Sequence, residues 1–333
     1  MPGSTLELNV KSLFEVYLNS ISDVPDERNK QVASDVLKQI ESGAEFPLAM
    51  RSSVSLLTYA CDMLDVSKKS NAYKKVVALS LREKARNEFV LHARAEFLRL
   101  CEKTPVVPLE IRGAKFGSLY YPHSDLRHTH ALRFAIFDSA SHRKAVAELM
   151  QAGWQRRGHS VQADAHLISM ASPMGVELEL YQRLLPHSKI IPDATTQDDP
   201  AFLAALLLCQ AKFGGQFPAH RWLIDLAFMC SGEEIDSART VQFIQEFGLA
   251  GTCSRMLSVG LELLPGSGSA LSKGQIKRLF DALQSSTSDV PRDSTQAAAA
   301  LKAYTPRSPG FTRRILSFAK RGFLSNIRQK RVR

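Results

Sequence analysis

The chain lacks the short motifs that identify several large classes of enzyme. It contains no GxxxxGK[ST] phosphate-binding loop, no GxGxxG after a strand-like run, no GxSxG turn and no HExxH pair. Their absence excludes the sequence signatures of P-loop nucleotide hydrolases, Rossmann dinucleotide-binding proteins, α/β-hydrolases and HExxH metalloproteases. A function has to be sought in weaker patterns.

Cysteine pairs and long apolar runs are also missing. The five cysteines form no CxxC pair and no zinc-finger spacing, which favours a reducing compartment over a disulfide framework. The longest strongly apolar run, Phe202–Cys209, is far too short to span a bilayer. The opening residues, MPGSTLELNVKS, lack the basic start and apolar stretch of a secretory signal. We therefore expect a cytoplasmic protein, free or peripheral to the inner membrane.

Length and composition predict a folded core with extensions. A chain of 333 residues that is 44% hydrophobic can bury a substantial core. We predict an α+β fold, in which a small mixed sheet is flanked by helices and by helical N- and C-terminal regions. The predicted order is a helical N-terminal region at 1–70, an α/β core at 71–190, a helical domain at 191–284, a linker at 285–310 and a basic amphipathic tail at 311–333.

Two short apolar runs in the middle of the chain have the composition of strands. Val106–Arg112 ends at a glycine, and Leu132–Phe137 ends at Asp138. Between them the pattern predicts a helix over 114–120, a proline-containing turn and a polar loop rich in His, Ser and Arg. A later helix is predicted at Lys144–Gly153. The sequence therefore places a polar loop between two strands of one sheet.

Three motifs around these runs carry a family resemblance. Ile111-Arg112-Gly113-Ala114, Tyr121-Pro122 and Leu126-Arg127 have the order and spacing of L-K-G-x-A-L, Y-P and L-R-x-x-x-D-I-D-L-L-V. This series resembles a family of bacterial nucleotidyltransferase-like proteins with the polymerase β-like fold. Val176–Leu180 is similar to the family's acidic strand, and Arg221–Leu226 to its L-R-W-x-x-D-L helix. The resemblance covers about residues 75–265 and implies the nucleotidyltransferase fold for the core.

The acids that such enzymes need are largely replaced. In the family, two carboxylates at i and i+2 of one strand and a third from a neighbouring strand hold two magnesium ions. An ungapped alignment puts the paired aspartates on Ala131 and Arg133, and neither side chain can bind a metal. Glu179 is the candidate third acid and the candidate catalytic residue, with Glu177 as the alternative register. We predict a degenerate site without a cofactor, and we expect magnesium only if the protein is an active enzyme.

The basic residues of the motifs suggest a ligand. A guanidinium at position 133 would bind a phosphate or carboxylate directly, and the resemblance adds a ligand-binding set around it. The predicted ligand is therefore a nucleotide or a phosphorylated small molecule. The alternative is that Arg133 lies on a solvated strand face. The ligand-binding set is Arg112, Gly113, Lys115, Arg127 and Arg133.

Three other interpretations of these residues stay open. An active metal-dependent nucleotidyltransferase would need an altered acidic site formed by Asp138, Glu177 and Glu179. A zinc site would need the loop histidines, which are otherwise expected to be solvent-exposed. Trp222 and Asp225 would lie beside the cleft in the family, but we favour a packed helix with an internal salt bridge. The loop histidines are His123, His128 and His130.

Charge is concentrated at the end of the chain. Residues 294–333 contain ten Lys and Arg and no acid, so the other 33 basic residues balance the 33 acids of the rest of the chain. Apolar residues recur there at helical spacing, including Phe311, Ile315, Phe318 and Phe323, as in segments that lie on anionic membrane surfaces. A membrane-surface adaptor is thus an alternative function. Nucleic-acid binding and docking on the protein itself are rival roles for the tail.

Overall fold

A computed structural model provides the fold. It describes residues 10–19, 27–44, 53–66, 68–103, 107–157, 166–185, 188–193, 195–213, 221–232, 234–264 and 270–287. All of these belong to a compact unit that spans Met1–Ser288, and Asp289–Arg333 is a second unit. The tail at 311–333 and most of the linker at 285–310 lie outside the described residues, so the membrane and nucleic-acid roles remain predictions.

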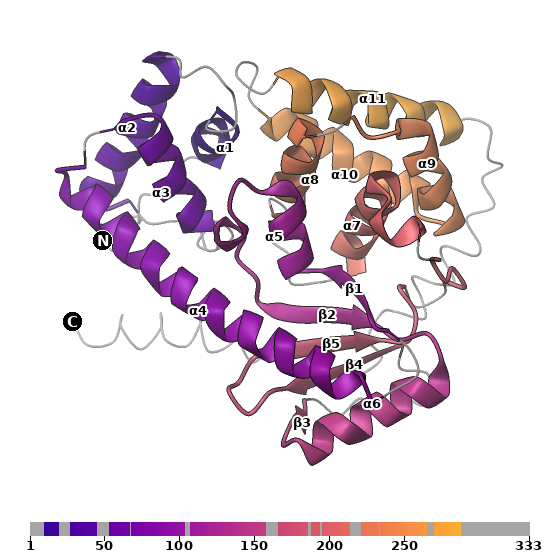
Figure 1. Cartoon of the computed structure of the whole chain (residues 1–333). Helices are drawn as coiled ribbons and strands as arrows, with labels where there is room; N and C mark the ends of the chain where they lie inside the picture. Colours follow the sequence, from indigo (N-terminus) through magenta and orange to yellow (C-terminus); the bar gives the residue numbers. More distant parts are fainter. Residues whose placement is uncertain are drawn as a thin grey trace, which may run out of the picture. The chain divides into compact units, whose positions relative to one another are not determined.

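The described residues form helices and a small sheet, an α+β fold (Figure 1). The helices are α1 (Val10–Asn19), α2 (Glu27–Glu41), α3 (Val54–Met63), α4 (Asn71–Cys101), α5 (Ala114–Tyr120), η2 (Ser124–Leu126), α6 (Ser139–Gln151), η3 (Thr196–Asp198), α7 (Pro200–Phe213), α8 (Arg221–Gly232), α9 (Ser237–Glu246), α10 (Ala250–Leu263) and α11 (Ala270–Thr287). The strands are β1 (Leu109–Arg112), β2 (Ala131–Ala135), β3 (Gln155–Arg156), β4 (Leu167–Ala171) and β5 (Glu177–Tyr181).

The sheet is mixed, with the strand order β1-β2-β5-β4-β3. β2 and β5 are parallel, and the other neighbours are antiparallel. A parallel pair needs a long crossover connection, which α6, β3 and β4 provide between β2 and β5. The register sets Arg133 opposite Glu179. This pairing determines the chemistry of the central strands.

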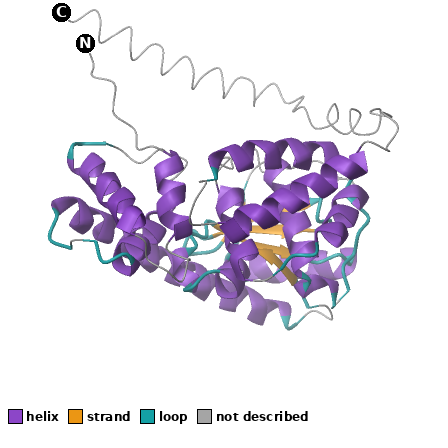
Figure 2. Cartoon of the chain, turned by 90° about the horizontal axis from the view of Figure 1, so that it is seen from above, coloured by secondary structure: helices purple, strands orange, loops and turns teal. Residues whose placement is uncertain are grey.

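Alternation along β2 and β5 divides the sheet into an apolar face and a polar face. Leu132, Phe134, Leu178 and Leu180 pack under α4 and α6, where Phe97 lies against Phe134 with ring centroids 4.5 Å apart. Figure 1 shows α4 and α6 on one side of the sheet and the C-terminal helices on the other, and Figure 2 shows the sheet from above, covered by helices. The polar face turns toward those helices. It is formed by Ala131, Arg133, Glu177, Glu179 and Tyr181.

An irregularity in β1 sends two nearby charges to opposite faces. Glu110 pairs with Phe134, and Arg112 pairs with Arg133. Between these two pairs β1 therefore contains one more residue than β2. Residues at i and i+2 normally share a face, but this bulge reverses the orientation. Glu110 therefore reaches Arg94 on α4, with both hydrogen bonds under 3 Å, while Arg112 is placed on the polar side.

A second apolar cluster connects the helices. It contains residues of α1 to α3, of β1 and α5, and of α7 to α11. The run Phe202–Cys209 lies within α7 and is buried on all sides. Within the part of the chain that the structure describes, no helix is long and apolar enough to cross a membrane. One apolar cluster thus extends through all three regions that the sequence separates at 70 and 190.

Several predicted elements are confirmed, with differences at their ends. The helix predicted over 114–120 is α5, and the helix predicted at Lys144–Gly153 is α6, which begins earlier because Asp138 caps it. The runs Val106–Arg112 and Leu132–Phe137 contain β1 and most of β2. The sequence did not predict β3 and β4. β3 is two exposed residues long, too short for a recognisable pattern.

The long helix α4 buries only part of its apolar surface. Phe89 and Leu91 are 55% and 49% exposed. The buried stripe includes Val90, Phe97 and Leu100, which follow helical spacing. Residues 89 and 91 lie about 100° to either side of Val90, because each residue advances the helix by about that angle, and so they fall at the edges of the buried stripe.

The contact between α8 and α10 predicts the effect of one substitution. A Cβ at Gly260 would lie 2.9 Å from Trp222 Cη2 and 3.0 Å from Leu223 Cδ1, both in buried side chains. Gly260→Ala should therefore lower the free energy of unfolding by about 1–3 kcal/mol. Gly251→Ala in the same helix meets no atom within 4 Å and should be neutral or stabilising. Urea denaturation of both variants checks this, and equal effects would contradict the close packing.

Candidate functional site

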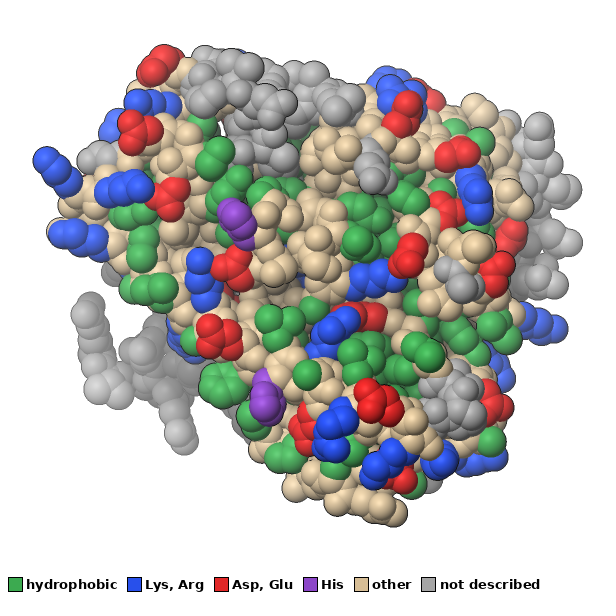
Figure 3. Space-filling view, viewed as in Figure 1, with side chains coloured by type: hydrophobic (Ala, Val, Ile, Leu, Met, Phe, Trp, Pro, Cys, Tyr) green, Lys and Arg blue, Asp and Glu red, His purple; other side chains and the backbone are tan. Residues whose placement is uncertain are grey.

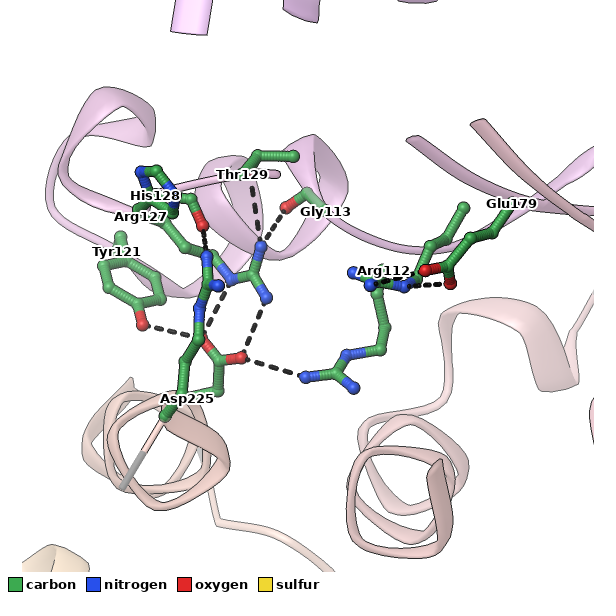
Figure 4. Close-up of polar contacts among 10 residues, drawn as sticks. Arg112, Gly113, Tyr121, Arg127, His128, Thr129, Glu179 and Asp225 are labelled. Carbon is green, nitrogen blue, oxygen red and sulfur yellow. Dashed lines mark hydrogen bonds and ion pairs between the residues drawn. The ribbon is translucent and has the colours of Figure 1, made fainter. Parts of the chain in front are cut away.

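A buried carboxylate on α8 forms the centre of the candidate site. The Asp225 side chain is 1% exposed, and Arg127 binds it through Nε–Oδ1 and Nη2–Oδ2 hydrogen bonds of 2.8 Å each. The Tyr121 hydroxyl donates to Oδ1 at 2.6 Å, and Arg112 Nη2 donates to Oδ2 at 3.4 Å. Figure 4 shows these side chains converging on Asp225. The contacts join α8 to the end of β1 and to the loop after α5.

The arginines keep this interior carboxyl group ionised. Burial raises the pKa of a carboxyl group, but the charge and hydrogen bonds of Arg127, together with the charge of Arg112, lower the pKa of Asp225 to about 2. Burial and the Asp225 charge raise the pKa of the Tyr121 hydroxyl, so Tyr121 stays a donor. Asp225 is therefore a carboxylate at neutral pH with its oxygens already bound by protein groups.

Arg127 also holds the backbone at the start of α5. Its Nη1 donates to the Gly113 carbonyl oxygen at 2.9 Å. Gly113 has φ +89°, and a Cβ there would lie 3.4 Å from Thr129 Cγ2 and 3.6 Å from the Ala131 carbonyl oxygen. A side chain at this position would be strained. The predicted ligand residues Gly113 and Arg127 are thus in contact, and both have a clear structural role.

The second part of the site lies on the polar face. Arg133 binds Glu179 through Nε–Oε2 and Nη2–Oε1 hydrogen bonds of 2.7 and 3.1 Å, and the Tyr181 hydroxyl donates to Oε2 at 2.7 Å. Burial acts to raise the pKa of Glu179, but Arg133 outweighs it and the pKa is lowered. Glu179 is therefore an ionised group that accepts three protein hydrogen bonds.

Positive charge exceeds negative charge in the cluster formed by the Asp225 and Glu179 groups. Burial, together with the charges of Arg127 and Arg133, lowers the pKa of Arg112 to about 10. Burial and the same two charges lower the pKa of Arg221 to about 9. Both stay protonated at neutral pH. Four guanidinium groups therefore interact with two carboxylates, and we call this set the arginine cluster. It consists of Arg112, Arg127, Arg133, Arg221, Glu179 and Asp225.

Three other predicted residues have separate partners. Lys115 Nζ binds the Asp198 carboxylate and donates to the Gln197 carbonyl at 3.3 Å. Asp138 is exposed and caps α6, where it accepts from the Ser141 amide at 2.7 Å. Glu177 accepts from the Ser169 hydroxyl at 3.2 Å. Lys115 and Asp138 thus stabilise local structure next to the sheet.

The residues at the presumed metal position do not fit magnesium. Ala131 offers no ligand and Arg133 is a cation, so Glu179 is the remaining acid of the three that the resemblance implies. Mg²⁺ requires oxygen ligands in octahedral geometry. Arg133 and Tyr181 already bind the carboxylate of Glu179, which leaves the site without a suitable donor set.

The three loop histidines do not form one group. His123 lies against Tyr59, with ring centroids 5.7 Å apart, whereas His128 and His130 contact each other. Across the described ranges, no group of three or more His, Cys, Asp and Glu side chains has an arrangement that could hold a metal.

His128 and His130 belong to a directed chain of hydrogen bonds. Arg86 Nη2 lies 2.9 Å from His130 Nδ1, and arginine can only donate, so that nitrogen is an acceptor. The His130 Nε2–H then donates to His128 Nε2 at 2.8 Å. His128 therefore carries its proton on Nδ1, which contacts the Glu83 carboxylate. We assign both tautomers from these partners. The chain runs from a cation to an anion through two neutral imidazoles.

The environment keeps both imidazoles neutral. Burial is the main cause that lowers the pKa of His128, and it outweighs the opposite effect of Glu83. Burial and the adjacent His128 ring lower the pKa of His130. Arg221 contributes to both shifts, and its Nη2 donates to the His128 carbonyl oxygen. The histidine chain is therefore linked to the arginine cluster.

The helix α8 differs in one respect from its prediction. Trp222 is 5% exposed and packs against Gly260, as a packing role requires. The expected salt bridge inside the helix is wrong, because Asp225 pairs with Arg127 and Arg112 from distant segments. Sequence distance hides such partners, since Arg127 and Asp225 are 98 residues apart.

Comparison of the chain with models of known families, with curated proteins and with solved structures gives no match. The resemblance to nucleotidyltransferase-like proteins therefore depends on the motif residues themselves. The roles of those residues are inferred from the contacts described above.

Sequence reasoning missed several residues that complete the site. Tyr181 could have been found, because it lies two residues after Glu179 and so shares its strand face. The roles of Tyr121 and Arg221 had no comparable signal, although both lie inside the recognised motifs. Glu83 and Arg86 are a turn apart on α4, but nothing in that helix indicates histidine partners.

Loss of the Asp225 charge should strongly destabilise the protein. Asp225→Asn would leave Arg127 and Arg112 buried without a counter-charge, and we expect the free energy of unfolding to fall by about 3–5 kcal/mol. Tyr121→Phe removes one hydrogen bond and should cost about 1–2 kcal/mol. Asp281 forms an exposed ion pair with Lys277, so Asp281→Asn should change the free energy of unfolding by less than about 1 kcal/mol. Chemical denaturation of the three variants at pH 7 gives the comparison.

The neutral histidines should make stability depend on pH. Their pKa values are lower in the folded state than in the unfolded state, so acidification below about pH 6.5 favours the unfolded chain. The free energy of unfolding should fall between pH 6.5 and 4.5, by at most about 1.4 kcal/mol per pH unit for each histidine. The change should be smaller in His130→Asn than in the wild type. His92→Asn, at an exposed position of α4, is the control, and equal slopes in all three proteins would refute the assignment.

Proposed function

We propose that the chain is a degenerate member of the nucleotidyltransferase-like proteins that binds a nucleotide or another phosphorylated small molecule without transferring a nucleotide. The observation that supports this most is the ion pair of Arg133 with Glu179. The alignment puts an arginine at an acid position, and the register brings it onto the one remaining acid. A guanidinium there takes the place of the metal charge.

The charge balance favours an anionic ligand. The arginine cluster has four guanidinium groups and two carboxylates, so its formal charge is positive. In a partly desolvated environment this excess attracts an anion more strongly than it would in water. Guanidinium groups also match phosphate oxygens with paired hydrogen bonds.

Access to the cluster is best at its sheet end. The side chains of Arg133 and Glu179 are 13% and 21% exposed, whereas those of Arg112 and Asp225 are each 1% exposed. Arg133 would therefore touch the ligand, and the interior arginines would contribute their charge. Figure 3 shows acidic and basic side chains interspersed over the visible face. The described surface there has no large basic patch that would compete with the arginine cluster for an anionic ligand.

One substitution distinguishes anion binding from metal-dependent binding. Glu179→Gln releases Arg133 and adds one positive charge, so the affinity for ATP, GTP, CTP or UTP should rise by roughly threefold to tenfold without magnesium. For a metal-dependent site the same change removes a ligand, and affinity should fall. Isothermal titration calorimetry with and without Mg²⁺ measures the difference.

Matched variants test the assignment further. Glu177→Gln changes an acid on the same strand and face whose partner is Ser169, and its effect on nucleotide affinity should be clearly smaller. Arg133→Ala should abolish binding. Thermal denaturation of each variant shows whether it is folded. Binding that requires magnesium and is lost in Glu179→Gln would contradict the proposal and support an active transferase.

A further inference from the structure

A second candidate site lies between the N-terminal helices and α5. A pocket of about 730 Å³ opens there, bounded by α3, α4, α5 and the turn that leads into η2. This volume is within the range of small-molecule sites. Its lining is rich in hydroxyl groups, including Ser55, Thr58, Tyr59, Ser80, Ser118 and Ser124. None of these residues belongs to the arginine cluster.

The wall of the pocket mainly offers hydrogen-bond acceptors. The Ser80 hydroxyl donates to Ser55 Oγ at 3.3 Å, Thr58 donates to the Val54 carbonyl at 3.3 Å, and Ser118 donates to the Lys115 carbonyl at 2.9 Å. A hydroxyl that has used its proton keeps acceptor lone pairs. These oxygens are therefore suited to a ligand that carries many O–H donors.

The charges of the lining do not suit a phosphate. Asp62 and Asp125 contribute two carboxylates, and Lys84 contributes one ammonium group, which pairs with Asp125 at 2.9 Å. Asp62 accepts from the Tyr73 hydroxyl at 2.6 Å and pairs with Lys68 at 2.9 Å. The charges at the pocket are thus balanced, unlike those of the arginine cluster, and Lys84 and Lys68 each already bind a carboxylate.

Aromatic surface completes the lining. The rings of Tyr59 and His123 meet edge to face at the pocket, and the Tyr121 ring, stacked on Phe228 at 4.2 Å, lines another part of it. Apolar ring faces next to acceptors match the C–H and O–H surfaces of a sugar ring. We infer that this pocket binds a neutral saccharide, at a site separate from the proposed phosphate site.

Tyr121 connects the two sites. Its ring lines the pocket and its hydroxyl binds Asp225, so a ligand in the pocket would contact the residue that supports the arginine cluster. Saccharide binding should nevertheless persist in Arg133→Ala. The failure of one proposal can therefore be distinguished from the failure of the other.

The test uses the full chain and saturation-transfer-difference NMR with galactose, N-acetylglucosamine, maltose and glucosamine as probes. We expect the neutral sugars to give signals with the wild type. Ser118→Phe fills the pocket from the exposed side of α5 and should abolish the signals. Leu119→Phe, at a neighbouring position that is 52% exposed and outside the lining, should retain them.

A second variant keeps the test valid if Ser118→Phe fails to fold. Thr58→Val keeps the shape of the side chain but removes the acceptor oxygen, and it should weaken sugar binding by about tenfold, a typical loss for one hydrogen bond. The absence of signals from every neutral sugar would overturn the inference. So would unchanged signals in both pocket variants, or signals from the glucosamine cation alone.

Discussion

The pairing of Asp225 with Arg127 is the interaction on which the rest of the site depends. A carboxylate that is 1% exposed would be costly without a counter-charge, and a guanidinium that is 4% exposed would be equally costly. Each is stable in the interior because the other is present. The pair fixes the loop after α5 to a helix that lies 98 residues later in the chain. The same arginine also holds the Gly113 carbonyl, so the entry to α5 depends on it as well.

The polar face of the sheet follows from a second constraint, the cross-strand register. Arg133 and Glu179 are directly opposite in a parallel pair, close enough for two hydrogen bonds. Beside the other arginines of the cluster, Arg133 would be unstable alone, but here it meets the Glu179 carboxylate. The presence of Arg133 and the presence of Glu179 are therefore physically linked.

Tyr121 shows how one residue can join regions with different chemistry. Its hydroxyl belongs to the Asp225 contacts, and its ring stacks on Phe228 and borders the hydroxyl-rich pocket. The histidine chain from Arg86 to Glu83 approaches the same region from α4, through Arg221 and the His128 carbonyl. Charged groups in this part of the fold thus lie in one connected network. Burial, together with the positive charges of this network, lowers the pKa values of Arg112, Arg221, His128 and His130.

The sequence by itself determined the periodic elements and the residue types of the site. Local patterns predicted α5 and α6, and the spacing of the motifs singled out Arg112, Gly113, Arg127 and Arg133. Local patterns suffice for this because helices and strands depend on neighbours within a few residues. Only the tertiary structure decided the partners. The bulge that separates Glu110 from Arg112, the register that joins Arg133 to Glu179 and the distant Asp225 that binds Arg127 all depend on packing between segments, and no local pattern encodes which buried charge will meet which.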